Sequence, residues 1–318
     1  VHVLPKSRYE RNPTVSATDP KPNAVFDKLR GEPVAGLGTS GYLDAADGTK
    51  LFYEYWKPKD RPVEKVLIAL HGMAAHSRYM CVLADTLVPH GVAVAVMDYR
   101  CHGLSGDKLG DIKNIDVLMD DVRRFCLFVR DLFPDVPIFT LGESMGGAVN
   151  VNLNIDPPVK ISGMILYAPA IASAMKFSLS QVVLLPALLF CMAFAPGARI
   201  IKVTGNEADG MRSPLNIEYD QTDPLHLKYV SVRFLLQVKK LVDRGKKNGP
   251  AAINVPALIF QGGKDVAVSP AATKEFYETL SSTDKTFKFY DDAPHCMIND
   301  PEVAPEMRAM TRDWILAH

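Results

Sequence analysis

A serine between glycines stands near the middle of the chain, in the run GESMG at residues 142–146. A short apolar run at 138–141 precedes it, and a helical pattern at 148–153 follows. Strand, sharp turn and helix would expose the hydroxyl of Ser144 at a helix N-terminus, where developing negative charge is favoured. A glycine-bounded turn can also be an ordinary helix start. The strand and helix on either side favour the first interpretation, and the pattern predicts Ser144 as a nucleophile.

A serine hydroxyl needs a base, and the base needs an acid that orients it. Asp265 follows an apolar run at 257–260, and His295 follows another at 287–290. Both are expected in loops at the carboxyl ends of strands, the edge where the Ser144 turn also lies. Their order along the chain, Ser then Asp then His, is the one that accompanies a nucleophile on such a turn. The sequence therefore predicts these three residues as a catalytic set.

The acid and the base each have an alternative role. Asp265 could instead cap the helix expected to begin near Pro270. Asp291 and Asp292 compete weakly with Asp265, because they are too close to His295 in sequence to reach around the imidazole comfortably. His295 could also be an ordinary surface histidine. The positions of Asp265 and His295 after strands favour the catalytic interpretation.

Acyl transfer also needs two preorganised hydrogen-bond donors for the oxyanion. One is expected to be the backbone N–H of Met145, the residue after the nucleophile. The second is expected from the loop after the apolar run 66–70, where His71 and Gly72 precede Met73. We assign it to the N–H of Met73. Because both donors are backbone groups, the identity of the side chains there is weak evidence.

The remaining elements must place these residues at one sheet edge. Residues 42–45 and 51–56, on either side of an Asp-Gly turn, predict a β-hairpin. Helical spacing of apolar residues recurs at 118–132 and 303–314. Short apolar runs predict strands buried on both faces at 66–70, 92–96, 138–141, 161–167, 257–260 and 287–290. This alternation predicts an α/β fold with a mostly parallel central sheet and helices on both faces.

The same pattern divides the chain into an extended proline-rich arm at residues 1–38, a core in two parts at 39–167 and 230–318, and an inserted lid at 168–229. No clear strand is expected in the lid, and residues 177–198 contain no charged side chain. Such a length could nominally cross a membrane. A single span, however, would separate Ser144 from Asp265 and His295. We therefore expect an apolar lid over the sheet, with peripheral contact to a membrane or micelle.

Several segments together resemble the monoacylglycerol lipase and lysophospholipase group of α/β-hydrolases, whose relatives include proteins labelled serine aminopeptidases. The resemblance extends from about Gly41 to the C-terminus. It rests on HGMAAHS at 71–77, DYRCHGLSG at 98–106, GESMGG at 142–147, APA at 168–170 and DPL at 223–225. It implies an α/β-hydrolase fold with a helical lid. This chain departs from the group at Glu143, which replaces the usual His, at Cys101, which replaces a Gly, and at Cys296-Met297 after His295.

The lid is expected to line a tunnel for an acyl chain. The residues assigned to this tunnel are Phe177, Leu184, Leu185, Leu188 and Leu189. The alternative is ordinary helix packing by the same side chains. The expected reaction is hydrolysis of a single-chain lipid ester, a monoacylglycerol or a lysophospholipid, through a covalent acyl-enzyme. Alternatives are a short-chain esterase, thioesterase or aminopeptidase on the same residues, and a non-catalytic ligand receptor.

Composition and short motifs argue against several classes of partner, metal site and cofactor. Lys plus Arg and Asp plus Glu both total 36, and this balance argues against a nucleic-acid partner. The five cysteines are widely spaced and predict neither a disulfide framework nor a zinc site. The run GLGTSG at 36–41 matches a dinucleotide fingerprint, but a hairpin rather than a helix is expected after it, and no cofactor is implied.

The chain begins at Val1 rather than at a methionine, which predicts that a preceding segment has been removed or omitted. If that segment was a signal peptide, the protein would be exported. Otherwise it would be cytoplasmic or bound at a membrane surface. The sequence alone does not define the oligomeric state.

Overall fold

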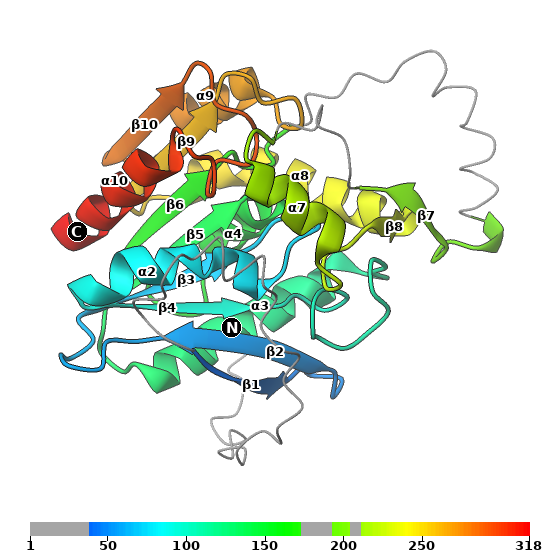
Figure 1. The fold of residues 1–318 in the computed structure, drawn as a ribbon, viewed down its shortest axis with the longest axis horizontal. Coiled ribbons are helices and arrows are strands. Elements are labelled where there is room, and N and C mark those ends of the chain that lie inside the picture. Colours follow the sequence, from blue (N-terminus) through cyan, green and yellow to red (C-terminus); the bar gives the residue numbers. More distant parts are fainter. Residues whose placement is uncertain (1–37, 173–192, 204–210) are drawn as a thin grey trace.

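A twisted eight-stranded sheet forms the centre of the molecule (Figure 1). The computed structural model describes residues 38–172, 193–203 and 211–318. The strands lie in the order β1-β2-β4-β3-β5-β6-β9-β10. Their bounds are β1 Thr39–Asp44, β2 Lys50–Trp56, β3 Lys65–Leu70, β4 Val92–Met97, β5 Ile138–Glu143, β6 Gly163–Tyr167, β9 Ala257–Gly262 and β10 Lys285–Tyr290. The strands β4, β3, β5, β6, β9 and β10 run parallel to one another, while β1 and β2 form an antiparallel hairpin at one edge. The predicted fold class is confirmed.

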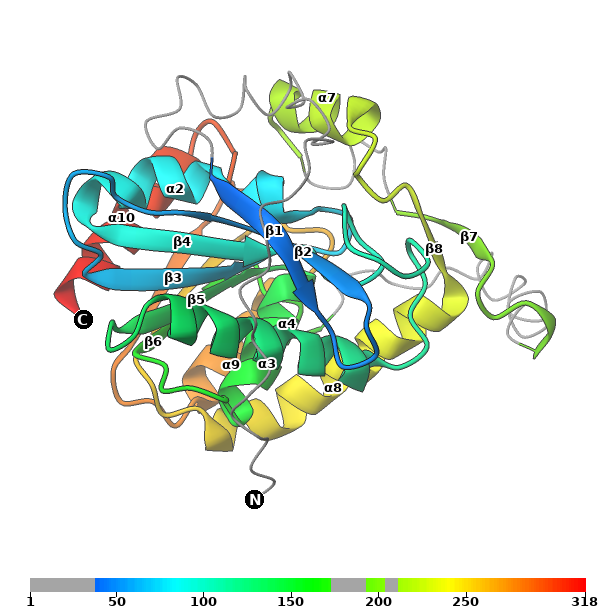
Figure 2. The ribbon, with the colours of Figure 1, turned by 90° about the horizontal axis from the view of Figure 1, so that it is seen from below.

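Helices cover both faces of this sheet (Figure 2). One face carries α2 (Val82–Leu87) and α10 (Ala304–Ala317), and the other carries α3 (Ile115–Leu132), α4 (Met145–Ile155), α8 (Val232–Ala252) and α9 (Pro270–Thr279). Short 3-10 helices η1 (Ser77–Met80) and η2 (Val88–His90) flank α2. The position of β3 between two layers of helices explains why its sequence is almost entirely apolar. Leu67 packs toward the α2 side, and Ile68 packs toward the α3 side. A strand buried on both faces needs apolar residues at every position.

The last strand differs from the prediction. Residues 287–290 were expected to be buried on both faces, but β10 is only half-buried and Phe289 is 42% exposed. The reason is position, since β10 pairs with β9 on one side and forms the edge of the sheet. Its aromatic residues suit a pleated surface that is only partly covered, and such a surface is typical of an edge strand rather than of a core strand.

The segment between β6 and α8 contains a feature that the sequence pattern did not predict. Strand β7 (Arg199–Lys202) pairs antiparallel with β8 (Tyr229–Ser231), apart from the main sheet, and α7 (Pro214–Thr222) lies between them in sequence. The expectation of no strand at 168–229 was therefore wrong. Ile201 packs against the core while Ile200 faces outward. Four residues give too short an alternation to stand out in the sequence.

Some predicted features cannot be compared with the structure. The tunnel residues Phe177, Leu184, Leu185, Leu188 and Leu189 lie outside the described residues, as does all but the last residue of the 1–38 arm. In the part of the chain that is described, no helix is both long enough and apolar enough to span a bilayer.

Candidate active site

Ser144 occupies the turn that joins β5 to α4. Its backbone has φ 54° and ψ −118°, a left-handed conformation that residues other than glycine rarely adopt. The turn is held from both sides: the Ser144 N–H donates to the Tyr167 carbonyl at 3.0 Å, and the Ala170 N–H donates to the Ser144 carbonyl at 2.9 Å. Strain of this kind persists only where the surrounding structure enforces it, and such sites are frequently functional.

The two glycines of the motif are required by close backbone approach. A Cβ on Gly142 would lie 2.2 Å from the Gly146 carbonyl oxygen, and a Cβ on Gly146 would lie 2.0 Å from the Leu70 oxygen. A side chain at Gly142 would push the start of α4 away from β5, and one at Gly146 would push the turn away from β3. The glycines therefore allow the nucleophile turn to sit directly against the loop that follows β3.

The three predicted side chains lie in one hydrogen-bonded row. His295 Nε2 is 2.8 Å from Ser144 Oγ, and His295 Nδ1 is 2.7 Å from Asp265 Oδ2. Asp265 also accepts hydrogen bonds from the side chain of Gln261 and from the backbone N–H groups of Ala267 and Val268. Because this carboxylate accepts at both oxygens, Nδ1 carries the proton and Nε2 is free to accept one from Ser144.

The alternatives for these residues are excluded by the geometry. Ser269, not Asp265, caps α9, through a hydrogen bond from the Ala272 N–H. Asp292 is exposed and pairs with Lys264 at 2.7 Å. His295 is only 8% exposed, so it is not a surface histidine.

Two ionisable side chains near Ser144 have shifted pKa values. Burial by itself would lower the pKa of His295, but the hydrogen bond and negative charge of Asp265, together with Glu143, raise it above the ordinary 6.5. Burial also raises the pKa of Glu143 to about 7, and this outweighs the opposing influence of His295. Glu143, directly before Ser144, and His295, hydrogen-bonded to the Ser144 hydroxyl, thus both have a raised pKa.

The predicted oxyanion donors lie beside the serine. An added Cβ on Gly72 would be 3.7 Å from the Ser144 Cβ, which places the loop that carries Met73 against the nucleophile turn. In the described part of the chain, neither the Met73 N–H nor the Met145 N–H donates to a main-chain carbonyl. The assignment of these two N–H groups as oxyanion donors stays a prediction.

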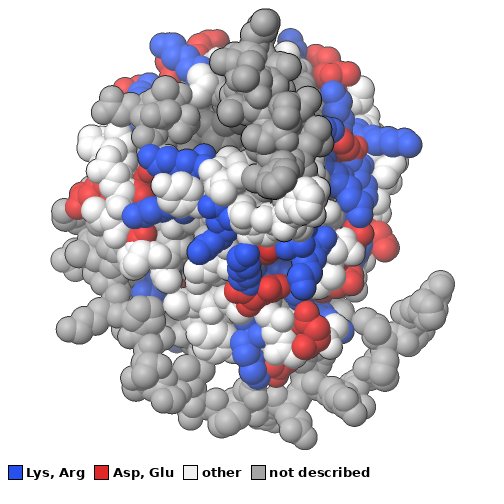
Figure 3. Space-filling view, turned by 90° about the vertical axis from the view of Figure 1, so that its right-hand side faces the viewer, with Lys and Arg blue, Asp and Glu red and all other residues white. Residues whose placement is uncertain are grey.

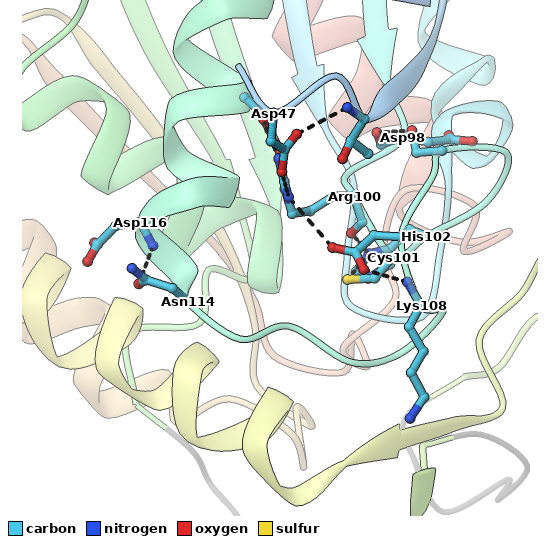
Figure 4. A network of polar contacts seen from close by, with 12 residues as sticks. Asp47, Asp98, Arg100, Cys101, His102, Lys108, Asn114 and Asp116 are labelled. Carbon is cyan, nitrogen blue, oxygen red and sulfur yellow. Dashed lines mark hydrogen bonds and ion pairs between the residues drawn. The ribbon is translucent and has the colours of Figure 1, made fainter. Parts of the chain in front are cut away.

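Sequence reasoning gave no role to the residues that support this loop. His102 Nε2 is 2.7 Å from the Met73 carbonyl oxygen, and burial lowers the pKa of His102, so it acts as a neutral hydrogen-bond donor. The neighbouring Arg100 forms a two-pronged ion pair with Asp121. It also reaches Asp47 (Figure 4). The only sequence signal was their shared place in the DYRCHGLSG segment.

Cys101 precedes His102 in a conformation that explains one departure from the group. Its backbone φ is 62°, within the left-handed region that favours glycine, and its side chain is fully buried. The resemblance of the DYRCHGLSG segment implies a Gly here, and this chain holds a cysteine in a strained conformation instead. Burial raises the pKa of its thiol strongly, which favours an inert packing role over a reactive one.

Polar contacts connect the segment between β6 and α8 to both catalytic loops. His76, in the loop after β3, contacts Asp223 at 2.9 Å, and the Leu227 N–H donates to the Ala74 carbonyl at 2.9 Å. Arg212 forms a two-pronged pair with Asp300, five residues after His295, at 2.8 and 3.0 Å. The position of this segment is therefore coupled to the loops of Met73 and His295.

A parallel sheet whose central strand ends in a strained serine turn, with Asp and His after later strands, defines an α/β-hydrolase. The chain belongs to the family described as serine aminopeptidase, S33 (Hydrolase_4), which matches residues 61–302. Both the fold and the family resemblance expected from the sequence are thus confirmed. Within the described residues, no group of His, Cys, Asp and Glu side chains is arranged to hold a metal ion.

Relatives and solved structures agree with this placement. The chain is 28% identical to the monoglyceride lipase of Mus musculus over 276 residues, covering 86% of this chain and 89% of the relative. It is 28% identical to phospholipase YtpA of Bacillus subtilis (strain 168) over 266 residues, covering 82% and 99%. The monoacylglycerol lipase structure from Paleococcus ferrophilus matches with a TM-score of 0.71 at 23% identity, covering 84% and 99%. The protein is a serine hydrolase with lipase and esterase relatives.

Proposed function

We propose that the protein hydrolyses esters of single-chain lipids, monoacylglycerols or lysophospholipids, through a covalent acyl-enzyme on Ser144. The observation that carries this proposal is the row Asp265–His295–Ser144 beside two backbone donors that have no main-chain acceptor among the described residues. The substrate class is supported by the names of the relatives, which are monoglyceride lipases and a phospholipase.

The proposed reaction has two similar halves. His295 Nε2 takes the proton of Ser144 as Oγ attacks the ester carbonyl, and the N–H groups of Met145 and Met73 stabilise the oxyanion. The imidazolium, oriented by Asp265, then gives its proton to the departing alcohol, which leaves the acyl group on Ser144. Water, deprotonated by His295, attacks the acyl-enzyme and releases the fatty acid.

A panel of esters tests both the chemistry and the substrate class. Rates would be compared for p-nitrophenyl esters from C2 to C16, monooleoylglycerol, lysophosphatidylcholine and an aminoacyl p-nitroanilide. We expect the highest kcat/KM on the long-chain esters, with no turnover by Ser144→Ala. A preference for C2, or cleavage of only the anilide, would contradict the lipid assignment. Failure of a fluorophosphonate probe to label the unaltered protein would contradict the hydrolase mechanism itself.

We further propose that the surface around the β7–β8 strand pair brings the protein to a lipid surface. Three apolar side chains on or near these strands are exposed: Phe194 by 74%, Ile200 by 51% and Tyr229 by 48%. The described residues 193–203 and 228–242 contain no Asp or Glu, whereas Arg199, Lys202 and Lys228 are exposed. Figure 3 shows Lys and Arg side chains on both sides of uncharged surface on this face. Apolar side chains with a basic rim complement an anionic bilayer.

Vesicle sedimentation tests this surface, with Ser144→Ala as the background so that no lipid is consumed. We expect binding to vesicles of phosphatidylcholine with phosphatidylglycerol, weaker binding to phosphatidylcholine alone, and release at high salt. Each Gln substitution at Arg199, Lys202 and Lys228 should weaken binding about fivefold. The matched control replaces three exposed lysines outside the β7–β8 surface, Lys57, Lys59 and Lys247. Equal losses in both sets, or dimerisation through the β7–β8 surface, would contradict the proposal.

A further inference from the structure

Two buried histidines contact the loop that carries Met73. His71 opens that loop directly after β3, and His102 comes from the loop after β4; both side chains are fully buried. Their rings lie with centroids 5.3 Å apart, and both pack against the ring of Tyr99. A buried polar ring must find its hydrogen-bond partners within the protein. The partners of the two rings therefore indicate what these histidines hold in place.

The ring of His71 fixes the peptide that contains the Met73 N–H. The backbone N–H of Tyr99 donates to Nε2 at 3.3 Å, and Nδ1 lies 2.8 Å from the Gly72 carbonyl oxygen. Burial lowers the pKa of His71 well below 6.5, so the ring is neutral and its single proton is on Nδ1. The Gly72 carbonyl and the Met73 N–H belong to one planar trans peptide. The N–H therefore points away from the His71 ring, and the hydrogen bond at the carbonyl strengthens it as a donor.

His102 holds the other side of Met73. Its Nε2 is 2.7 Å from the Met73 carbonyl oxygen, while its Nδ1 is 3.1 Å from the Arg100 carbonyl oxygen. The ring is neutral, so it carries one proton and donates to only one of these oxygens. Nδ1 also lies 3.8 Å from Sγ of Cys101 (Figure 4). Because burial raises the pKa of this thiol, it stays protonated and donates to Nδ1, which leaves the His102 proton on Nε2, toward Met73.

We propose that His71 and His102 are positioning residues that orient the backbone N–H of Met73 toward the oxyanion, and that the Cys101 thiol keeps the His102 proton on the nitrogen facing Met73. Cys101 stands where the resemblance implies Gly, so this part of the arrangement is a property of this chain. The inference rests on the proposed acyl-enzyme mechanism and adds to it what fixes the direction of one oxyanion donor. It does not depend on the lipid class of the substrate.

Paired substitutions separate these hydrogen bonds from simple packing. His71→Leu and His102→Leu remove the donors, whereas His71→Asn and His102→Gln place an amide N–H near the positions of Nδ1 and Nε2. The Leu variants should lower kcat for a p-nitrophenyl ester by about 10- to 100-fold with little change in KM, because the oxyanion exists only in the transition state. The amide variants should recover most of this loss. Asn154→Ala is the control, since it removes a buried hydrogen bond to Thr140 near the other end of α4 and should leave kcat unchanged.

Two ketones of equal chain length test the oxyanion directly. A trifluoromethyl ketone forms an adduct in which Ser144 Oγ bonds to the carbonyl carbon, His295 takes the serine proton and the carbonyl oxygen becomes negative. The methyl ketone binds without forming that charge. In the Leu variants the Ki of the trifluoromethyl ketone should rise in proportion to the fall in kcat/KM, while the Ki of the methyl ketone stays constant. Equal changes for both ketones, or an unaltered kcat in the fraction of enzyme that a fluorophosphonate labels, would show packing alone and overturn the proposal.

Nitrogen NMR on protein with isotopically labelled histidine shows which ring nitrogen of His102 carries the proton, with His102→Gln for the assignment. We expect the proton on Nε2 in the unaltered protein and in Cys101→Ser. In Cys101→Ala the proton should move to Nδ1, and kcat should fall about fivefold. A proton on Nδ1 in the unaltered protein would overturn the proposal, even if the Leu variants do not fold. Absence of fluorophosphonate labelling in the unaltered protein would instead contradict the Ser144 mechanism, and this inference with it.

Discussion

The nucleophile turn and the segment between β6 and α8 are stabilised by different means. Backbone hydrogen bonds, close glycine contacts and a buried apolar core hold Ser144 in place. Polar side chains hold the other segment, through the pairs His76–Asp223 and Arg212–Asp300. That segment also leaves Phe194 and Ile200 exposed. The contrast indicates that the chemistry depends on backbone geometry that few substitutions can adjust, whereas the approach to the site depends on a few replaceable polar contacts.

The largest effect is expected at the turn itself. Ser144→Ala should lower kcat by about 10⁴-fold or more, because it removes the nucleophile while the oxyanion donors remain. The melting temperature should change little, since alanine occupies the same backbone position. Hydrolysis of a p-nitrophenyl ester measures the first quantity, and differential scanning calorimetry measures the second. The exposed Ser281→Ala provides the control, and equal activity of the two variants would be incompatible with the proposed role of Ser144.

The next effect tests how strongly the segment after β6 depends on its polar contacts. His76→Ala should destabilise the protein by about 3 to 4 kcal/mol, because it leaves the carboxylate of Asp223 buried without its partner. Urea unfolding would measure the loss. Arg61→Ala breaks an exposed pair with Glu64 and should cost about 0.5 kcal/mol or less. Similar losses from the two substitutions would remove the distinction between the two regions.

Glu143 provides a pH-dependent test within the core. Its pKa is raised from an ordinary 4.5 to about 7, so folding favours the protonated form. The resulting stabilisation is complete below about pH 4.5 and is lost as the pH rises through about 7. Glu143→Gln should therefore be more stable than the unaltered protein at pH 8.5, by about 2 to 3 kcal/mol, and nearly equal to it at pH 4.5. Melting curves of both proteins at the two pH values would measure this difference in stability. The same difference at both pH values would count against a buried, titrating carboxylate.

The smallest effect is expected at Cys101. Glycine removes the strain of the left-handed backbone but also the packing of the buried side chain, whereas alanine removes only the packing. Cys101→Gly should consequently be more stable than Cys101→Ala by about 1 kcal/mol. Comparison of the two variants by chemical denaturation isolates the backbone effect. If alanine proved the more stable of the two, the left-handed conformation at this position would be in error.

Local pattern was enough to predict the residues at the sheet edge. The predicted strands 138–141, 257–260 and 287–290 end three to five residues before Ser144, Asp265 and His295, so these three predictions needed no knowledge of distant contacts. Strand β7 could not be predicted in the same way, because its pairing with β8 joins residues about thirty positions apart. The support of Met73 by His102 also depends on loops that meet only in the folded chain.

The contact of Arg212 with Asp300 has one more consequence. Coupling between two sites is reciprocal, so a change in the loop of His295 that acts through this ion pair alters the docking of the α7 region by the same free energy. Covalent occupancy of Ser144 that orders this loop would then protect the chain around Arg212 from proteases. Cleavage there would, in turn, make the serine less reactive. Protease sensitivity at a surface remote from the chemistry would thus report whether the active serine is occupied.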